Sequence, residues 1–140
     1  MMATQLKVGD RLQAVTHEVT EDKMVEFEKV VWDRGRNSHS DINVAKADGI
    51  QRTIASGQNQ MAFLHEMMER NFADAWVYGG KISVRYIHPV YGGDKLTATG
   101  NVIEVKDEDG RLIERSKLVG LAREVGKQAA HAGIAKKWGT

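Results

Sequence analysis

The stretch QNQMAFLHEMMERNF, directly after Gly57, predicts a long amphipathic helix and constrains the fold more than any other feature of the sequence. At about 100° per residue, its apolar side chains cover about half of the helix circumference, and charged side chains occupy the other half. An apolar arc of this width is typical of a helix that a curved sheet partly surrounds. The arc consists of Met61, Phe63, Leu64, Met67, Met68 and Phe72.

Five segments with the composition of β-strands flank the helical region. Residues 11–19 (RLQAVTHEV) precede it, and we expect Leu12 and Ala14 to share one face of that strand. The order of one strand, helices and then four strands predicts an α+β fold, in which an antiparallel sheet packs one face on a helix. The four later strands are expected at residues 81–87, 95–105, 111–124 and 127–138.

Two shorter helices are predicted between the first strand and the long helix. Thr20 is a suitable N-cap for a helix at about residues 21–32, where apolar side chains recur at helical spacing. Asp41 is a suitable cap for a second helix that runs through Ala47. Gly49 is expected to end this helix, because glycine adopts positive φ at little cost.

Composition limits the classes of function. A chain of 140 residues with 41% hydrophobic residues is long enough for one compact domain, which we expect to span residues 1–140. Its 20 basic and 19 acidic residues are scattered, so no nucleic-acid partner is predicted. The chain has no cysteine and only five histidines, and we expect no metal. Without a signal-like start or a long apolar run, we expect a cytoplasmic protein that does not contact a membrane.

A polar loop before the long helix carries the residues most suited to catalysis. His39 lies two positions before Asp41, with Asp33 and Asn37 upstream. A carboxylate that orients an imidazole lets the ring take a proton from a shared water near pH 7, as the hydration of a double bond requires. At the helix start, Gly57 leaves room for an acyl carbonyl to approach backbone N–H groups that can stabilise developing negative charge.

A purely structural interpretation competes at each of these positions. A single histidine in a loop is more often solvated than catalytic, and an aspartate before a short helix is usually a cap. Methionine-rich helix faces more often belong to a core than to a substrate tunnel. Taken singly, these residues do not establish a site, and the order of the motifs carries the functional interpretation.

The ordered motifs resemble those of the MaoC-like hydratases, a family with the hot-dog fold that includes the (R)-specific enoyl-CoA hydratases. The family pattern is H-x-D, then A and G at intervals of four, then I-A-x-G and later P-V-x-x-G-D. The spacing from His39 to Gly57 fits this pattern without a gap. The matching residues are His39, Asp41, Ala45, Gly49, Ile54, Ala55, Gly57, Pro89, Val90, Gly93 and Asp94.

The resemblance implies a fold and an activity. It implies a five-stranded antiparallel sheet wrapped around the long central helix, a homodimer or dimer of dimers, and no cofactor. It also implies a hydratase or dehydratase of fatty acid metabolism, a lyase that acts on 2-enoyl or 3-hydroxyacyl thioesters of CoA or acyl carrier protein. The alternatives are a protein that binds acyl thioesters without turnover and, less favoured, an acyl-CoA thioesterase.

The resemblance also implies roles for site residues, with one departure. His39 matches the catalytic histidine, Gly57 matches the oxyanion position, and Ser56 and Asn37 are expected beside the substrate. The family reads D-x-N-P-x-H, whereas Asp33 stands six positions before His39 rather than five, and no proline intervenes. A bulge near Gly35 would return the Asp33 carboxylate to the site. Otherwise His39 works with Asn37, with Asp41 or alone.

Overall fold

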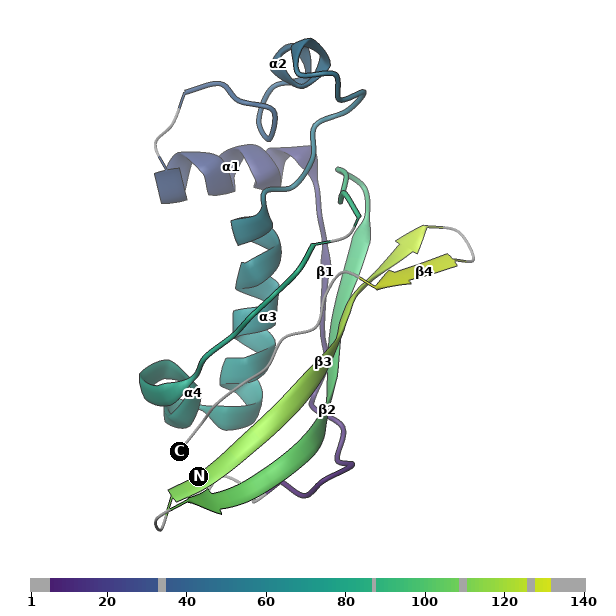
Figure 1. Ribbon diagram of the computed structural model, residues 1–140. Helices are drawn as coiled ribbons and strands as arrows, with labels where there is room; N and C mark the ends of the chain where they lie inside the picture. The colour runs from purple at the N-terminus through teal and green to yellow at the C-terminus, as the bar shows by residue number, and fades with distance from the viewer. Residues whose placement is uncertain (1–5, 33–34, 87, 109–110, 126–127, 132–140) are drawn as a thin grey trace.

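The computed structural model describes residues 6–32, 35–86, 88–108, 111–125 and 128–131, with side chains through Val105. Four helices and one antiparallel sheet make up this part of the chain, and the sheet order is β1-β2-β3-β4 (Figure 1). The elements are β1 Val15–Glu18, α1 Glu21–Trp32, α2 Ile42–Ala47, α3 Gly57–Phe72, α4 Asp74–Gly79, β2 Lys95–Glu108, β3 Arg111–Val125 and β4 Gln128–His131.

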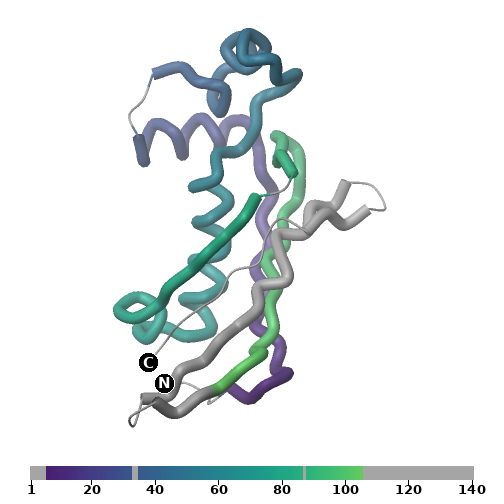
Figure 2. The backbone as a smooth tube through the Cα atoms, viewed as in Figure 1, coloured from purple at the N-terminus to yellow at the C-terminus, as the bar shows by residue number. Residues whose placement is uncertain are grey.

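The predicted long helix is confirmed as α3, which begins at Gly57 and ends at Phe72. Strand β2 curves past one side of α3, as the backbone trace shows (Figure 2), and β3 pairs with β2 in the sheet. Burial of each large apolar side chain between helix and sheet contributes about 1.5–3 kcal/mol. The core between these layers includes Leu12, Val15, Leu64, Met67, Met68, Leu96, Ala98 and Val102.

The first strand is shorter than predicted and contains an irregularity. Arg11 pairs with Asn101 and Val15 pairs with Ala98, so three residues lie opposite two between these pairs. The extra residue changes which side chains face the core, as a β-bulge does. Leu12 is therefore buried as expected, but Ala14 is exposed, and the prediction that these two share a face was wrong.

The predicted strand at residues 81–87 is not a strand over residues 81–86. That stretch is an extended segment outside the sheet, so the described residues contain four strands rather than five. Ile82 and Val84 pack against the core, while Lys81, Ser83 and Arg85 are exposed. The alternation of apolar and polar residues therefore indicates that every second side chain is buried. An extended segment can bury side chains in this way without hydrogen bonds to a neighbouring strand. Of the predicted last strand, residues 132–138 lie outside the described residues.

Both shorter helices form where their caps predict them. The Thr20 hydroxyl accepts the Lys23 N–H at 3.2 Å at the start of α1. The Asp41 carboxylate accepts backbone N–H groups at the start of α2, and Gly49 follows α2 with a φ of 80°. No helix in the described ranges has both the length and the apolar character needed to cross a membrane.

Candidate active site

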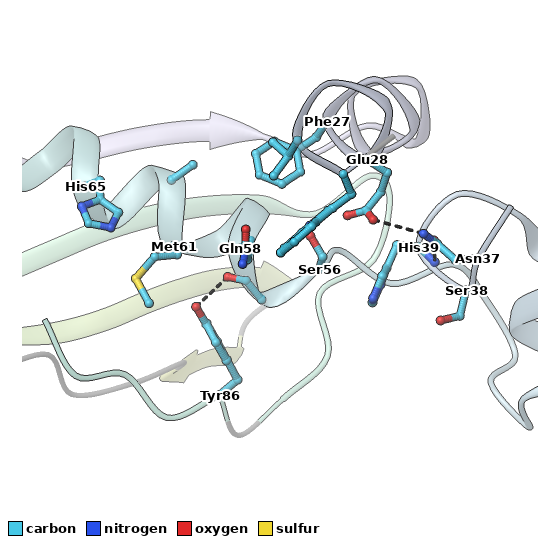
Figure 3. Close-up of a pocket in the computed structure, with 14 residues that line it drawn as sticks. Phe27, Glu28, Asn37, Ser38, His39, Ser56, Gln58, Met61, His65 and Tyr86 are labelled. Carbon is cyan, nitrogen blue, oxygen red and sulfur yellow. Dashed lines mark hydrogen bonds between the residues drawn. The ribbon is translucent and has the colours of Figure 1, made fainter. Parts of the chain in front are cut away.

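A cavity of about 840 Å³ lies where α1, the loop around His39 and the start of α3 meet (Figure 3). It brings together four of the five predicted site residues, and the fifth, Asp33, lies outside the described residues. The volume is in the range of small-molecule binding sites. The lining residues are Phe27, Glu28, Val31, Trp32, Asn37, Ser38, His39, Ser56, Gly57, Gln58, Met61, Ala62, His65 and Tyr86.

The His39 ring is held by a backbone carbonyl. Its Nδ1 atom lies 2.8 Å from the carbonyl oxygen of Ile54. Because a carbonyl oxygen can only accept, Nδ1 carries the hydrogen. In the neutral ring Nε2 is therefore the atom with a free lone pair, which is the state that a general base requires.

Asn37 connects the His39 loop to helix α1 through both ends of its amide. Its Oδ1 atom accepts the backbone N–H of His39 at 2.8 Å. Its Nδ2 atom donates to Oε2 of Glu28 at 3.2 Å, a contact drawn in Figure 3. The amide orientation is fixed by these two bonds, since Oδ1 cannot donate and Nδ2 cannot accept. Asn37 thus lines the cavity, with both amide atoms bound to protein groups.

Glu28 is a carboxylate in the cavity that the sequence motifs did not identify. Its exposed fraction is 4%, and its Oε1 atom has no hydrogen-bond partner among the described residues. It lies one turn after the buried Met24, on the face of α1 that packs inward. A charged residue four positions from a buried one, inside an apolar arc, was the available signal.

Ser56 and Gly57 form the start of α3 at the floor of the cavity. The Ser56 hydroxyl caps the helix by accepting the Asn59 N–H at 3.2 Å. As the first helical residue, Gly57 has an N–H that the helix ladder does not use, and the helix dipole adds partial positive charge there. This arrangement suits an oxygen that becomes negative during a reaction.

Tyr86 covers the same helix start and was also missed from the sequence. Its hydroxyl donates to the Gly57 carbonyl oxygen at 2.6 Å, and burial raises the pKa of the phenol. A Cβ atom on Gly57 would lie 2.9 Å from Cε2 of Tyr86. Glycine is therefore required at this position for the tyrosine ring to pack closely.

Asp41 has a structural role that occupies both carboxylate oxygens. Oδ1 accepts the N–H groups of Asn43 and Val44, and Oδ2 accepts from the Arg36 guanidinium. The Arg36 hydrogen bond, followed by that from Asn43, holds the pKa of Asp41 below its ordinary value. Asp41 lines a second cavity, of about 270 Å³, together with His39. Because the helix cap and Arg36 already use the oxygens of Asp41, this carboxylate is poorly suited to serve as the partner of His39.

His65 lies farther along α3 on the cavity wall, beyond Met61 (Figure 3). The indole N–H of Trp76 donates to its Nδ1 atom at 3.2 Å. No group of three or more histidine, aspartate or glutamate side chains able to hold a metal ion occurs within the described portion of the chain.

A family model described as "MaoC like domain" matches residues 4–124, most of the 140-residue chain. The chain belongs to the MaoC-like dehydratase family. This confirms the resemblance drawn from the motifs between His39 and Asp94, and it places the chain in a family of hydratases and dehydratases. A comparison with curated proteins found no match to the sequence.

Similar solved structures confirm the hot-dog fold. A MaoC-like dehydratase from Rhodospirillum rubrum is 17% identical, with a TM-score of 0.72 over 96% of this chain and 91% of that one. The ChsH1-ChsH2 complex from Mycobacterium tuberculosis gives 17% identity and a TM-score of 0.77 over 97% and 99%. The unliganded R-hydratase PhaJ1 from Pseudomonas aeruginosa is 21% identical, with a TM-score of 0.68 over 96% of this chain and 82% of that one.

Proposed function

We propose that this MaoC-like protein is a hydro-lyase that adds water to a 2-enoyl thioester of CoA or acyl carrier protein, or removes it from the 3-hydroxyacyl thioester. One observation carries the proposal. His39, with Nδ1 bound to a carbonyl, and Gly57, at the start of α3, line the same cavity. A base and an oxyanion donor in one cavity are the two groups that hydration of a thioester-conjugated double bond needs.

The reaction follows from these two groups. His39 Nε2 takes a proton from water as the water oxygen bonds to C3 of the enoyl chain. The electron pair of the double bond moves onto the thioester oxygen, which accepts a hydrogen bond from the Gly57 N–H. As the enolate collapses, C2 takes the proton from the imidazolium of His39. The hydroxyl of water then resides on C3 and its hydrogen on C2, and the reverse sequence is dehydration.

The remaining cavity wall suits an acyl chain. Phe27, Val31, Trp32 and Met61 supply apolar and aromatic surface next to the polar groups around His39. Burial of each methylene of an acyl chain against such surface contributes about 0.8 kcal/mol. The cavity thus combines a polar reacting end with an apolar binding region, as ligand sites commonly do.

Incubation with crotonyl-CoA and longer 2-enoyl-CoAs tests the proposal directly. We expect the absorbance of the conjugated thioester to fall without release of free CoA thiol. Release of thiol would identify a thioesterase instead. Saturable binding of the enoyl-CoA with no change in absorbance would identify a binding protein without turnover, which is the function that the altered spacing before His39 would favour.

A further inference from the structure

We propose that Glu28 is a second catalytic residue, whose Oε1 atom holds the reacting water or the substrate hydroxyl beside His39. The inference rests on the proposed hydratase function and assigns to helix α1 the carboxylate that the family motif places in the loop. Glu28 lines the cavity with His39, and the same asparagine side chain binds both residues.

The hydrogen-bond network leaves one particular oxygen of Glu28 for a ligand. Asn37 Oδ1 is used by the His39 N–H, so Nδ2 is the end of the amide that faces Glu28. Nδ2 binds Oε2 at 3.2 Å, whereas Oε1 has no partner among the described residues. The bond from Asn37 to Oε2 orients the carboxyl group, and Oε1 of the same group is therefore also fixed in position. A water or a hydroxyl is the kind of donor that satisfies this acceptor.

Burial makes a merely structural role for this glutamate costly. An unpaired polar atom removed from water destabilises the folded state, and more so when it is charged. Glu28 is 4% exposed and lies on the face of α1 that carries the buried Met24. An apolar side chain at this position would avoid the cost. Unsatisfied buried groups of this kind are typical of sites where function, rather than stability, determines the residue.

The chemistry places both groups on one water. One hydrogen of the water bonds to His39 Nε2 and the other to Glu28 Oε1, which directs an oxygen lone pair to C3. As the C3–O bond forms, the proton passes to His39, and the charge of Glu28 stabilises the resulting imidazolium. The proton then passes from His39 to C2, and Glu28 remains a carboxylate throughout. In dehydration, Oε1 accepts the hydrogen bond of the departing 3-hydroxyl.

Glu28→Gln is the decisive variant, with Glu26→Gln as its matched control on an exposed position of the same helix. Because Asn37 Nδ2 only donates, the new amide turns its oxygen toward Asn37 and places its NH₂ where Oε1 stood. A donor then stands where an acceptor is required. We expect kcat for crotonyl-CoA to fall by about 100-fold or more, with KM little changed, and Glu26→Gln to match the parent protein.

Two readouts separate a catalytic role from a structural one. Thermal unfolding of Glu28→Gln should occur at the parental temperature or above, because a buried charge has been removed; a clear decrease would indicate a structural role and would overturn the proposal. The second readout is the split between kcat and KM: the loss in Glu28→Gln should fall on kcat and leave KM near the parental value. A loss that falls on KM, with kcat near the parental value, would also contradict the proposal.

Asp33→Asn distinguishes the two carboxylates. If Glu28 is the site's carboxylate, Asp33→Asn retains most of the parental activity. Loss of activity in Asp33→Asn, with a near-parental Glu28→Gln, would overturn the proposal and leave the hydratase function intact, with Asp33 as the acid. A parent protein that hydrates no enoyl thioester would overturn the hydratase function and the Glu28 role together.

Discussion

At the scale of single residues, the orientation of His39 depends on a carbonyl rather than on a carboxylate. Ile54 supplies that carbonyl, and its own position is fixed because Ile54 pairs with Tyr91 and the Ala55 N–H donates to the Val90 carbonyl at 2.7 Å. The ring is therefore positioned by backbone that is anchored to residues 90–91, just before β2. This arrangement does not require an acidic neighbour in the loop to select the tautomer.

Replacement of His39 tests its role as the base. His39→Ala should lower kcat by about 100-fold or more, the usual size of a general-base contribution. His39→Asn is the matched variant, because its amide nitrogen can replace Nδ1 as donor to the Ile54 carbonyl while Nε2 is lost. We expect His39→Asn to unfold at the parental temperature and to be as inactive as His39→Ala. Hydration at a near-parental rate by either variant would exclude His39 as the base.

Gly57 presents two separable requirements, the packing of Tyr86 and the approach of substrate. A methyl group on Gly57 would meet the Tyr86 ring at 2.9 Å, so Gly57→Ala should displace the ring and reduce kcat/KM. Adding Tyr86→Leu removes the steric conflict. If the thioester oxygen binds at the Gly57 N–H, the double variant stays impaired and Tyr86→Leu alone does not. Recovery of activity in the double variant would mean that only the packing of Tyr86 matters.

At the scale of elements, two helix starts organise the site. The start of α2 is capped by Asp41 and holds the chain just after His39. The start of α3 is capped by Ser56 and carries Gly57 at the cavity. Each cap satisfies N–H groups that would otherwise lack partners, and the dipoles of the helices favour negative charge at these ends. The same local rules that begin the helices therefore create the positive end of the site.

Ser56 is the cap whose loss can be measured most directly. Ser56→Ala should lower the free energy of unfolding by about 1 kcal/mol, because the Asn59 N–H loses its buried acceptor. Ser56→Thr retains a hydroxyl and should lose less. Chemical denaturation of the three proteins, with m-values compared, checks the prediction. An alanine variant as stable as the parent would show that the cap contributes nothing to the fold.

At the scale of the whole molecule, strong periodicity and capping chemistry could be recognised from sequence, whereas long-range pairing could not. The bounds of α3 and the caps Thr20 and Asp41 are local properties, and they were predicted correctly. The exposure of Ala14 depends on an irregularity between two strands distant in sequence. Glu28 was missed for a similar reason: its place in an apolar arc indicates burial, but nothing local reveals that α1 places it beside a loop nine or more residues later.

Apolar side chains on α1 and α4 are exposed among the described residues. On α1, Val30 is 79% exposed and is followed by the exposed Val31 and Trp32; on α4, Tyr78 is 87% exposed. Clustered exposed apolar residues commonly mark protein–protein contacts. The cluster on α1 is the larger, and two of its members, Val31 and Trp32, also line the cavity. An association that covers α1 would therefore also shape the binding site.

We predict a homodimer on these grounds, with the α1 cluster in its interface. Light scattering at micromolar concentration should give a mass of about twice the 15.6 kDa of one chain, or a multiple of that pair. Val30→Lys should shift the protein toward the monomer, because it places a charge in the apolar contact, and Tyr78→Lys on α4 is the control expected to remain associated. Val31 and Trp32 belong both to the α1 cluster and to the cavity lining, so the dissociated Val30→Lys protein should bind enoyl-CoA more weakly. A monomeric parent protein would contradict the prediction.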